Sequence, residues 1–200
     1  MQVGLDFDFE GESNKPSIKR ILLEVFIWVA QIAAVIFLAY IIVYYCVEKT
    51  NVIGSSMEST LAANDPIIIN KFAYRISDPK RFDVIVFKQS GKEHSFYNIK
   101  RIIGLPGETV LIKDGNIYIN GEMIEEYSIV EPMINYGLAG EEISLEDNEY
   151  FVLGDNRNNS EDSRFASIGN ITRDEIIGKA AIRLSPFNFI SKLNLKGQED

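Results

Sequence analysis

An apolar run from Val25 to Val47 is the feature that most limits how this chain can fold, because Gln31 is its only strongly polar side chain. A helix of this length spans roughly 34 Å at about 1.5 Å per residue, which is enough to cross the hydrocarbon core of a bilayer. Trp28 lies near one end and Tyr44 near the other, where aromatic side chains favour the membrane interface. The run therefore predicts a transmembrane helix rather than the buried helix of a soluble core.

The flanks of the run indicate a retained anchor and its orientation. The run exceeds the roughly 7–15 apolar residues of a cleaved leader, and bulky residues occupy 44–48, where cleavage requires small ones. Lys15, Lys19 and Arg20 precede the run closely and only Lys49 follows it closely, so the N-terminal side is expected to be cytoplasmic. We expect a cytoplasmic tail, one plasma-membrane anchor and an extracytoplasmic domain, over residues 1–24, 25–47 and 48–200.

Composition excludes several classes of function. The formal net charge of −9 opposes binding to nucleic acid, because such proteins carry a basic surface. The single cysteine, Cys46, allows no intramolecular disulfide, and together with the single histidine, His94, it supplies too few ligands for a structural zinc site. We therefore expect no nucleic-acid partner and no structural zinc site.

Short apolar runs follow the anchor and are separated by turn signals. They are rich in isoleucine, valine, phenylalanine and tyrosine, which favours strands, and Asp114-Gly115 between two of them indicates a hairpin. The segment 163–174 is the one place where a short helix is expected. The fold class is therefore mostly β, with an N-terminal transmembrane helix followed by an antiparallel β domain. The predicted strands cover residues 66–72, 81–87, 95–104, 108–115, 116–121, 149–155 and 176–184.

A first polar motif, GSSMESTL at 54–61, begins about seven residues after the anchor. A serine here would act close to the membrane surface, but serine becomes nucleophilic only beside a base, which this segment does not contain. Taken alone, the motif does not require a nucleophile, because its serines and threonine also suit an ordinary polar loop or a helix cap.

A second motif, YNIKRIIGLPG at 97–107, places two cations side by side in an apolar strand. Neighbouring strand residues point to opposite faces, so only one of Lys100 and Arg101 can face a given site. Arginine cannot lose its proton, whereas a lysine buried between Ile99 and Ile102 can, at a cost of about 3 kcal/mol for a pKa near 8. The alternative is a lysine that reaches from a strand edge to solvent.

A third motif, GDNRNNSEDSR at 154–164, follows the predicted strand EYFVL. Its asparagine, aspartate and serine side chains suit a turn, because they bond to their own backbone. Its acidic residues also suit a cation, but the glycine and glutamate spacing of an EF-hand is not met.

Together, in this order and behind an anchor, the three motifs resemble the boxes of the type I signal peptidases: G-x-S-M-x-P-T-L, [YN]-x-K-R-x-x-G-x-P-G and G-D-N-x-x-x-S-x-D-S-R. The resemblance covers nearly all of residues 25–185. It implies a membrane-bound serine endopeptidase that removes signal peptides from secretory preproteins, with a Ser-Lys dyad in an antiparallel β catalytic domain. It also implies a lipid bilayer and preproteins as partners, and a mechanism that needs no metal and no cofactor.

The resemblance assigns roles position by position. It makes Ser56 the nucleophile, with its backbone N–H in the oxyanion hole, and Lys100 the general base. Ser160 matches the serine that orients the lysine. Further matches are the supporting residues Asp155, Asp162 and Arg164, with an ion pair expected between the last two, and Met57, expected near the substrate and the membrane.

The sequence departs from the family pattern at three positions. Gly54 has no side chain where one branch of the family supplies a second oxyanion donor from a serine hydroxyl. Ser59 replaces the usual proline, which predicts a looser turn after the nucleophile. Phe82 replaces the glycine of the family's G-D-[IV]-V-V-F strand.

Other functions remain open on the sequence alone. One is a specialised relative with a narrow substrate set, and another is a non-catalytic anchored β domain with an assembly role. A self-cleaving repressor-type Ser-Lys protease fits less well, because the chain has an anchor and no helix-turn-helix signal.

Overall fold

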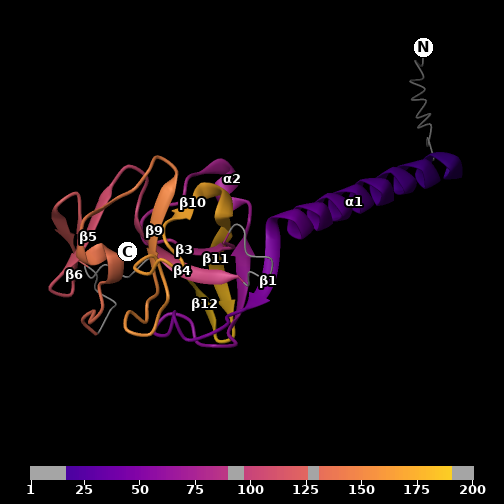
Figure 1. Cartoon of the computed structure of the whole chain (residues 1–200). Coiled ribbons are helices and arrows are strands. Elements are labelled where there is room, and N and C mark those ends of the chain that lie inside the picture. The colour runs from indigo at the N-terminus through magenta and orange to yellow at the C-terminus, as the bar shows by residue number, and fades with distance from the viewer. Residues whose placement is uncertain (1–16, 90–96, 126–130, 191–200) are drawn as a thin grey trace, which may run out of the picture. The chain divides into compact units, whose positions relative to one another are not determined.

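A computed structural model describes residues 17–89, 97–125 and 131–190, and it divides the chain into two compact units, Met1–Val43 and Tyr44–Asp200 (Figure 1). The cytoplasmic tail expected for the first residues lies mostly outside the described ranges. Each unit is described by itself.

The first unit consists mainly of the helix α1, Ile18–Cys46, which is long and apolar enough to cross a membrane. None of its residues is buried within the protein, so its apolar side chains are free to face lipid. The helix begins seven residues before the apolar run, where an exposed ion pair joins Arg20 to Glu24 one turn later (3.4 Å). It ends before Val47, which instead opens the first strand.

The second unit contains a main antiparallel sheet, as the sequence predicted. Its strands follow the order β1-β2-β11-β3-β4-β9-β10, and β12 pairs with β11. Strand β11 therefore lies between β2 and β3, although it comes late in the chain. The strand bounds are β1 Val47–Asn51, β2 Pro66–Asn70, β3 Val84–Phe87, β4 Asn98–Gly104, β9 Glu149–Leu153, β10 Ile171–Thr172, β11 Ile176–Leu184 and β12 Phe187–Phe189.

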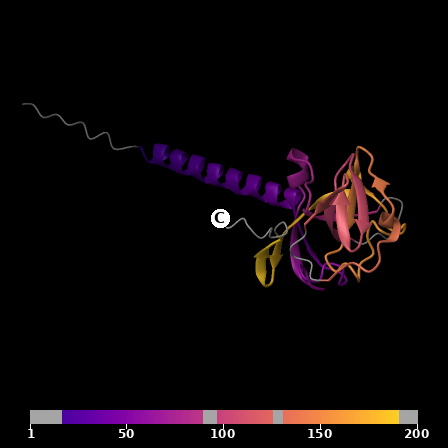
Figure 2. The same ribbon diagram turned by 90° about the vertical axis from the view of Figure 1, so that its left-hand side faces the viewer.

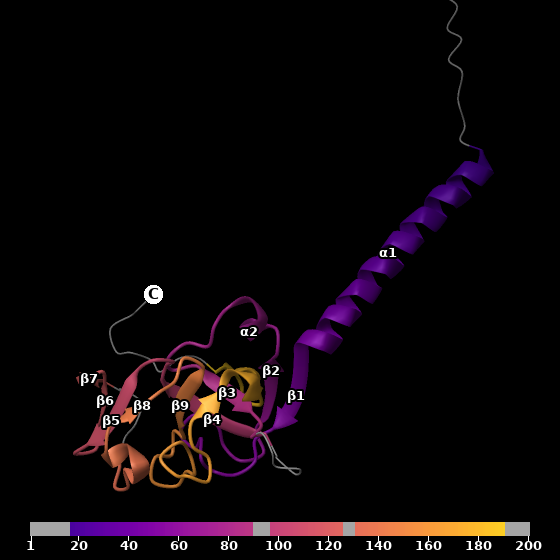
Figure 3. The ribbon, with the colours of Figure 1, turned by 45° about the horizontal axis from the view of Figure 1, so that its top comes forward.

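A smaller antiparallel sheet has the order β7-β6-β5-β8. The predicted hairpin joins β5 and β6, and Asp114 and Gly115 both have positive φ (50° and 78°), as a tight two-residue hairpin turn requires. Figure 3 shows this sheet at one end of the β domain and β1 with β2 at the other. Its strands are β5 Thr109–Lys113, β6 Asn116–Ile119, β7 Glu122–Ile124 and β8 Ile143–Ser144.

Among the described residues after α1, helical structure is limited to α2 (Ala73–Ile76) and the 3₁₀ turns η1 (Gly137–Gly140) and η2 (Arg173–Glu175). The short helix predicted for 163–174 is wrong except for the start of η2. Ser163 instead bonds to strand β9: its N–H donates to Val152 O (3.1 Å) and its Oγ accepts from Val152 N (2.9 Å). The following residues form separate turns, in which Phe165 N–H donates to Asp162 O (2.9 Å) and Ile168 N–H donates to Phe165 O (3.0 Å).

Three buried apolar clusters form the core of the second unit, and one of them lies beneath the first motif. That cluster joins Val52, Met57 and Leu61 of the β1–β2 loop to side chains of β2, β3, β4 and β11. The loop is therefore held by its apolar residues, while its polar residues lie toward the surface. At the other extreme, the β11–β12 hairpin extends beyond the rest of the domain with Phe187 and Phe189 exposed (Figure 2).

Candidate active site

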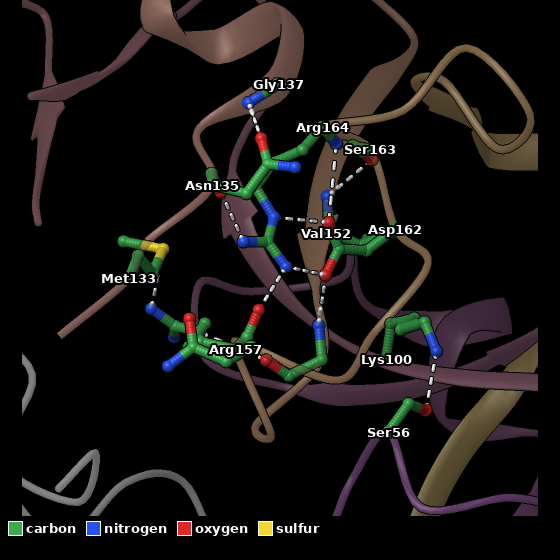
Figure 4. Close-up of polar contacts among 12 residues, drawn as sticks. Ser56, Lys100, Met133, Asn135, Gly137, Val152, Arg157, Asp162, Ser163 and Arg164 are labelled. Atoms are coloured by element: carbon green, nitrogen blue, oxygen red, sulfur yellow. Dashed lines mark hydrogen bonds and ion pairs between the residues drawn. The ribbon is translucent and has the colours of Figure 1, made fainter. Parts of the chain in front are cut away.

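Ser56 and Lys100, which are 44 residues apart in sequence, meet in the structure (Figure 4). Ser56 lies in the loop between β1 and β2, and Lys100 lies on β4. The Lys100 Nζ is 2.6 Å from Ser56 Oγ and donates a hydrogen bond to it. When the amine is neutral, the same contact allows nitrogen to accept the hydroxyl proton, which is the geometry that activates a serine.

The two neighbouring cations of β4 point in opposite directions, as the strand period predicts. Arg101 is 1% exposed, and its guanidinium donates to both carboxylate oxygens of Asp155 (2.7 and 2.6 Å) and to Phe82 O (2.9 Å). Lys100 alone therefore faces the serine. Arg101 instead binds Asp155 and Phe82 O, which lie beside the site.

Burial controls the titration of the lysine. Lys100 is 5% exposed, and this desolvation lowers its pKa below the usual value of 10.5. The carboxylates of Asp162, Glu161 and Asp155 oppose the effect because they stabilise the charged form, and Arg164 adds to it. The net result is an amine with a lowered pKa beside a serine hydroxyl.

Asp155 connects the three motifs. Besides the Arg101 guanidinium, its carboxylate accepts a hydrogen bond from Thr60 Oγ1 (2.5 Å) in the nucleophile loop. One buried side chain thus ties the serine loop, the lysine strand and the third motif together. Thr60 and Arg101 received no role from the sequence; their place inside the first two motifs was the only signal available.

The ion pair expected between Asp162 and Arg164 is present, at 2.8 and 2.9 Å between its bonded atoms, and both side chains are almost fully buried. Asp162 also accepts from Gly154 N (3.0 Å), while Arg164 donates to Arg157 O and Asn135 O (2.6 and 2.8 Å; Figure 4). The pair therefore shapes the third motif rather than touching the dyad.

Ser160 lies where the third motif meets the nucleophile loop. Its Oγ is buried and has no hydrogen-bond partner among the described residues, so its role in orienting Lys100 stays a prediction. A Cβ added to Gly154 would lie 2.2 Å from Ser160 Oγ and 2.5 Å from Ser56 O. Glycine at 154 is therefore required for the close approach of the two loops.

The backbone N–H of Ser56 is open. Within the ranges that the structure describes, it donates to no acceptor, as an oxyanion donor must. Gly54 has a φ of +82° and offers no side-chain donor. No three histidine, cysteine, aspartate or glutamate side chains of the described part group to hold a metal ion. A serine, a poised amine and a free N–H suit acyl transfer.

Two residues of the nucleophile loop carried expectations from the motif. The Met57 side chain is 1% exposed within the core, and its expected place near the substrate and the membrane stays a prediction; Ile53, at 70% exposure, is the exposed apolar residue nearby. Ser59 has a φ of +95°, which proline, fixed near −65°, cannot adopt. The turn after the nucleophile therefore has a backbone conformation that a proline at position 59 would not allow.

Phe82 stands where the family's strand pattern has a glycine, and its backbone conformation is one that favours glycine. Its φ of 68° lies in the left-handed region, where a glycine meets no steric penalty. Its ring packs against the buried cluster that contains Ile103 and Phe151, and its N–H donates to Ile102 O (2.8 Å). The packing of the side chain offsets the backbone cost that a glycine would avoid.

Comparison with known proteins gives a consistent result. A family model described as signal peptidase, peptidase S26, matches residues 25–185. A probable signal peptidase I-2 of Synechocystis is 42% identical over 147 residues. This match covers 71% of this chain and 65% of that relative. A signal peptidase I of Bacillus amyloliquefaciens is 34% identical over 190 residues, 92% of this chain and 98% of the relative. A crystal structure of an Enterococcus faecalis signal peptidase I gives a TM-score of 0.40 at 30% identity, over 52% of this chain and 97% of that one.

Proposed function

Because the chain belongs to the signal peptidase family, peptidase S26, we propose that it cleaves with Ser56 as nucleophile and Lys100 as general base. The protein is a membrane-anchored serine endopeptidase that removes signal peptides from preproteins. The observation that carries the residue assignment is the 2.6 Å contact between Lys100 Nζ and Ser56 Oγ in a largely desolvated site.

Acylation begins with neutral Lys100. Its nitrogen takes the Ser56 hydroxyl proton as Oγ attacks the carbonyl of the scissile bond. The new oxyanion lies at the Ser56 N–H, and Gly54 supplies no second side-chain donor. The intermediate then collapses, and Lys100 protonates the leaving amine, which becomes the N-terminus of the mature protein.

Deacylation uses the same groups in reverse order. A water molecule enters where the amine has left, and Lys100 removes one of its protons. The resulting hydroxide attacks the ester between Ser56 Oγ and the signal peptide. The tetrahedral intermediate collapses, the signal peptide leaves with a new carboxyl group, and the proton returns to Ser56 Oγ.

Cleavage of a purified preprotein in detergent tests this proposal. Ser56→Ala and Lys100→Ala are expected to lose cleavage. Their matched controls, Ser77→Ala and Lys113→Ala, are expected to retain it, because Ser77 only bonds to Ala73 O on the surface and Lys113 is exposed. Full cleavage by either dyad variant would contradict the assignment. A native protein that cuts one preprotein of many would point to the narrow-substrate alternative.

We also propose that residues 25–47 span the plasma membrane, with 1–24 cytoplasmic and 48–200 outside. Lys19 and Arg20 at the start of α1 support this orientation. Protease added to the outer face of wall-free cells is expected to digest the β domain and spare a cytoplasmic marker. Protection of the β domain until the membrane is permeabilised would reverse the proposed orientation.

A further inference from the structure

Asn156 holds the peptide groups on both sides of the nucleophile. Its backbone N–H donates to Ser56 O (3.0 Å), and its side-chain Nδ2 donates to Ser55 O (3.2 Å). The same Nδ2 is 3.3 Å from the Glu58 carboxylate, which also accepts a hydrogen bond from it. Three contacts thus join one residue of the third motif to the nucleophile loop.

The contact with Ser55 O bears directly on the oxyanion hole. Ser55 O and the Ser56 N–H belong to the same planar peptide group, so fixing the carbonyl fixes the direction of the N–H. The carbonyl also accepts from Glu58 N (3.0 Å), which closes the local turn. Hydrogen bonds accepted by a carbonyl polarise its peptide group, which makes the N–H a stronger donor.

The rest of the third motif fixes Asn156 relative to the lysine. The preceding residue, Asp155, is bonded to Arg101 beside Lys100, and Gly154 is held by Asp162. Asn156 therefore relates the Ser56 N–H to the strand that carries the base. Thr60 gives the nucleophile loop a second link to that strand through Asp155, but Asn156 is the residue of the third motif that donates to the Ser55 carbonyl itself.

We infer that Asn156 is a positioning residue for the oxyanion hole: its amide aims and polarises the Ser56 N–H. This inference rests on the proposed roles of Ser56 and Lys100. It matters particularly in this chain because Gly54 provides no hydroxyl, which leaves more of the developing charge to a single backbone donor.

Kinetics of the full chain in detergent test the inference through Asn156→Ala and the near-isosteric Asn156→Asp, which lacks the donor. Asn158→Ala is the matched control, because Asn158 lies in the same loop but bonds to Ile134 N and Pro132 O. We expect both Asn156 variants to lose about 10- to 100-fold in kcat with KM changed less than twofold. The control is expected to retain the native kcat.

Inhibitor binding separates positioning from a merely structural role. A peptide aldehyde ending in alanine adds Ser56 Oγ to its carbonyl and leaves a hemiacetal oxygen at the oxyanion hole. The corresponding peptide alcohol binds without this bond. For the Asn156 variants, we expect aldehyde affinity to fall by the same factor as kcat/KM and alcohol affinity to stay unchanged.

Three outcomes would overturn the inference. Native kcat and native aldehyde affinity in both Asn156 variants would remove the role. An equal loss of aldehyde and alcohol affinity would show damage to the whole site instead. If the native chain and Ser56→Ala cleave equally, the proposed function fails and the inference fails with it. The first outcome, found together with an inactive Ser56→Ala, removes the inference alone.

Discussion

The titration of Lys100 controls the rate at the residue scale. Only the neutral amine accepts the serine proton, and burial lowers the pKa of Lys100 below 10.5. We expect kcat/KM to rise with pH through that lowered pKa and then to level off. A pH profile of preprotein cleavage measures this; a half-maximal rate at the usual pKa of an exposed lysine would contradict a desolvated base.

The same group lowers the stability of the fold. Between the lowered folded pKa of Lys100 and the unfolded value of 10.5, the unfolded chain binds more protons, so native stability rises with pH across this window. Lys100→Met removes the buried charge and is expected to raise Tm at neutral pH. Each unit of pKa difference corresponds to about 1.4 kcal/mol.

Thermal unfolding at several pH values checks the sign of this effect. The increase in Tm of Lys100→Met over the native chain is expected to be largest below the folded pKa of Lys100 and to shrink as the pH approaches 10.5. A constant advantage across the range would assign the change to packing alone.

Residue types and their motifs predicted that Ser56 and Lys100 lie together, but not the backbone conformations around them. Lys100 was chosen as the base because lysine can lose its proton and arginine cannot. The alternation of side chains along a strand predicted that Arg101 points to the other face. The burial of Met57 was not predicted, because a motif does not reveal which of its residues enter the core. Ser59 and Phe82 adopt positive φ values that depend on tertiary packing, which residue type alone does not report.

Close approach of two loops is the critical feature at the scale of elements. Gly154→Ala places a Cβ within 2.5 Å of Ser56 O and closer still to Ser160 Oγ. We expect the nucleophile loop to shift and cleavage to fall at least about 100-fold, the scale of a misplacement of about 1 Å. The matched control is Gly140→Ala, whose Cβ would meet only Tyr136 Cβ at 3.7 Å.

Cleavage assays and circular dichroism compare the activity and the fold of Gly154→Ala with those of Gly140→Ala. Gly140→Ala is expected to keep native activity and a native spectrum. Full activity in Gly154→Ala would show that the contact between the loops tolerates an extra methyl group, and the requirement for glycine would be withdrawn.

Sequence patterns predicted most strands but not their neighbours. Apolar runs bounded by turn residues located β2 to β6, β9 and β11 closely, because local composition favours extended backbone. Strands β1, β7, β8, β10 and β12 were missed, since they are short or polar and depend on their partners. The placement of β11 between β2 and β3 is a long-range pairing that no local signal encodes.

At the scale of the whole molecule, the buried core belongs to the second unit. All three core clusters lie between Val52 and Ile190, and no residue of α1 is buried. A fragment of residues 47–200 is therefore expected to fold cooperatively and to cleave preprotein in mild detergent. Circular dichroism and the cleavage assay measure this, and a fragment without a cooperative transition would show that the anchor contributes to folding.

The position of β11 also bears on the order of events during biosynthesis. In the main sheet, the strands flanking Ser56 and the strand bearing Lys100 lie on opposite sides of β11. A nascent chain exposes its serine early, but the two halves of the sheet have no shared strand until Ile176–Leu184 emerges. We therefore expect the serine and the lysine to come together only late in synthesis, after most of the polypeptide has been made.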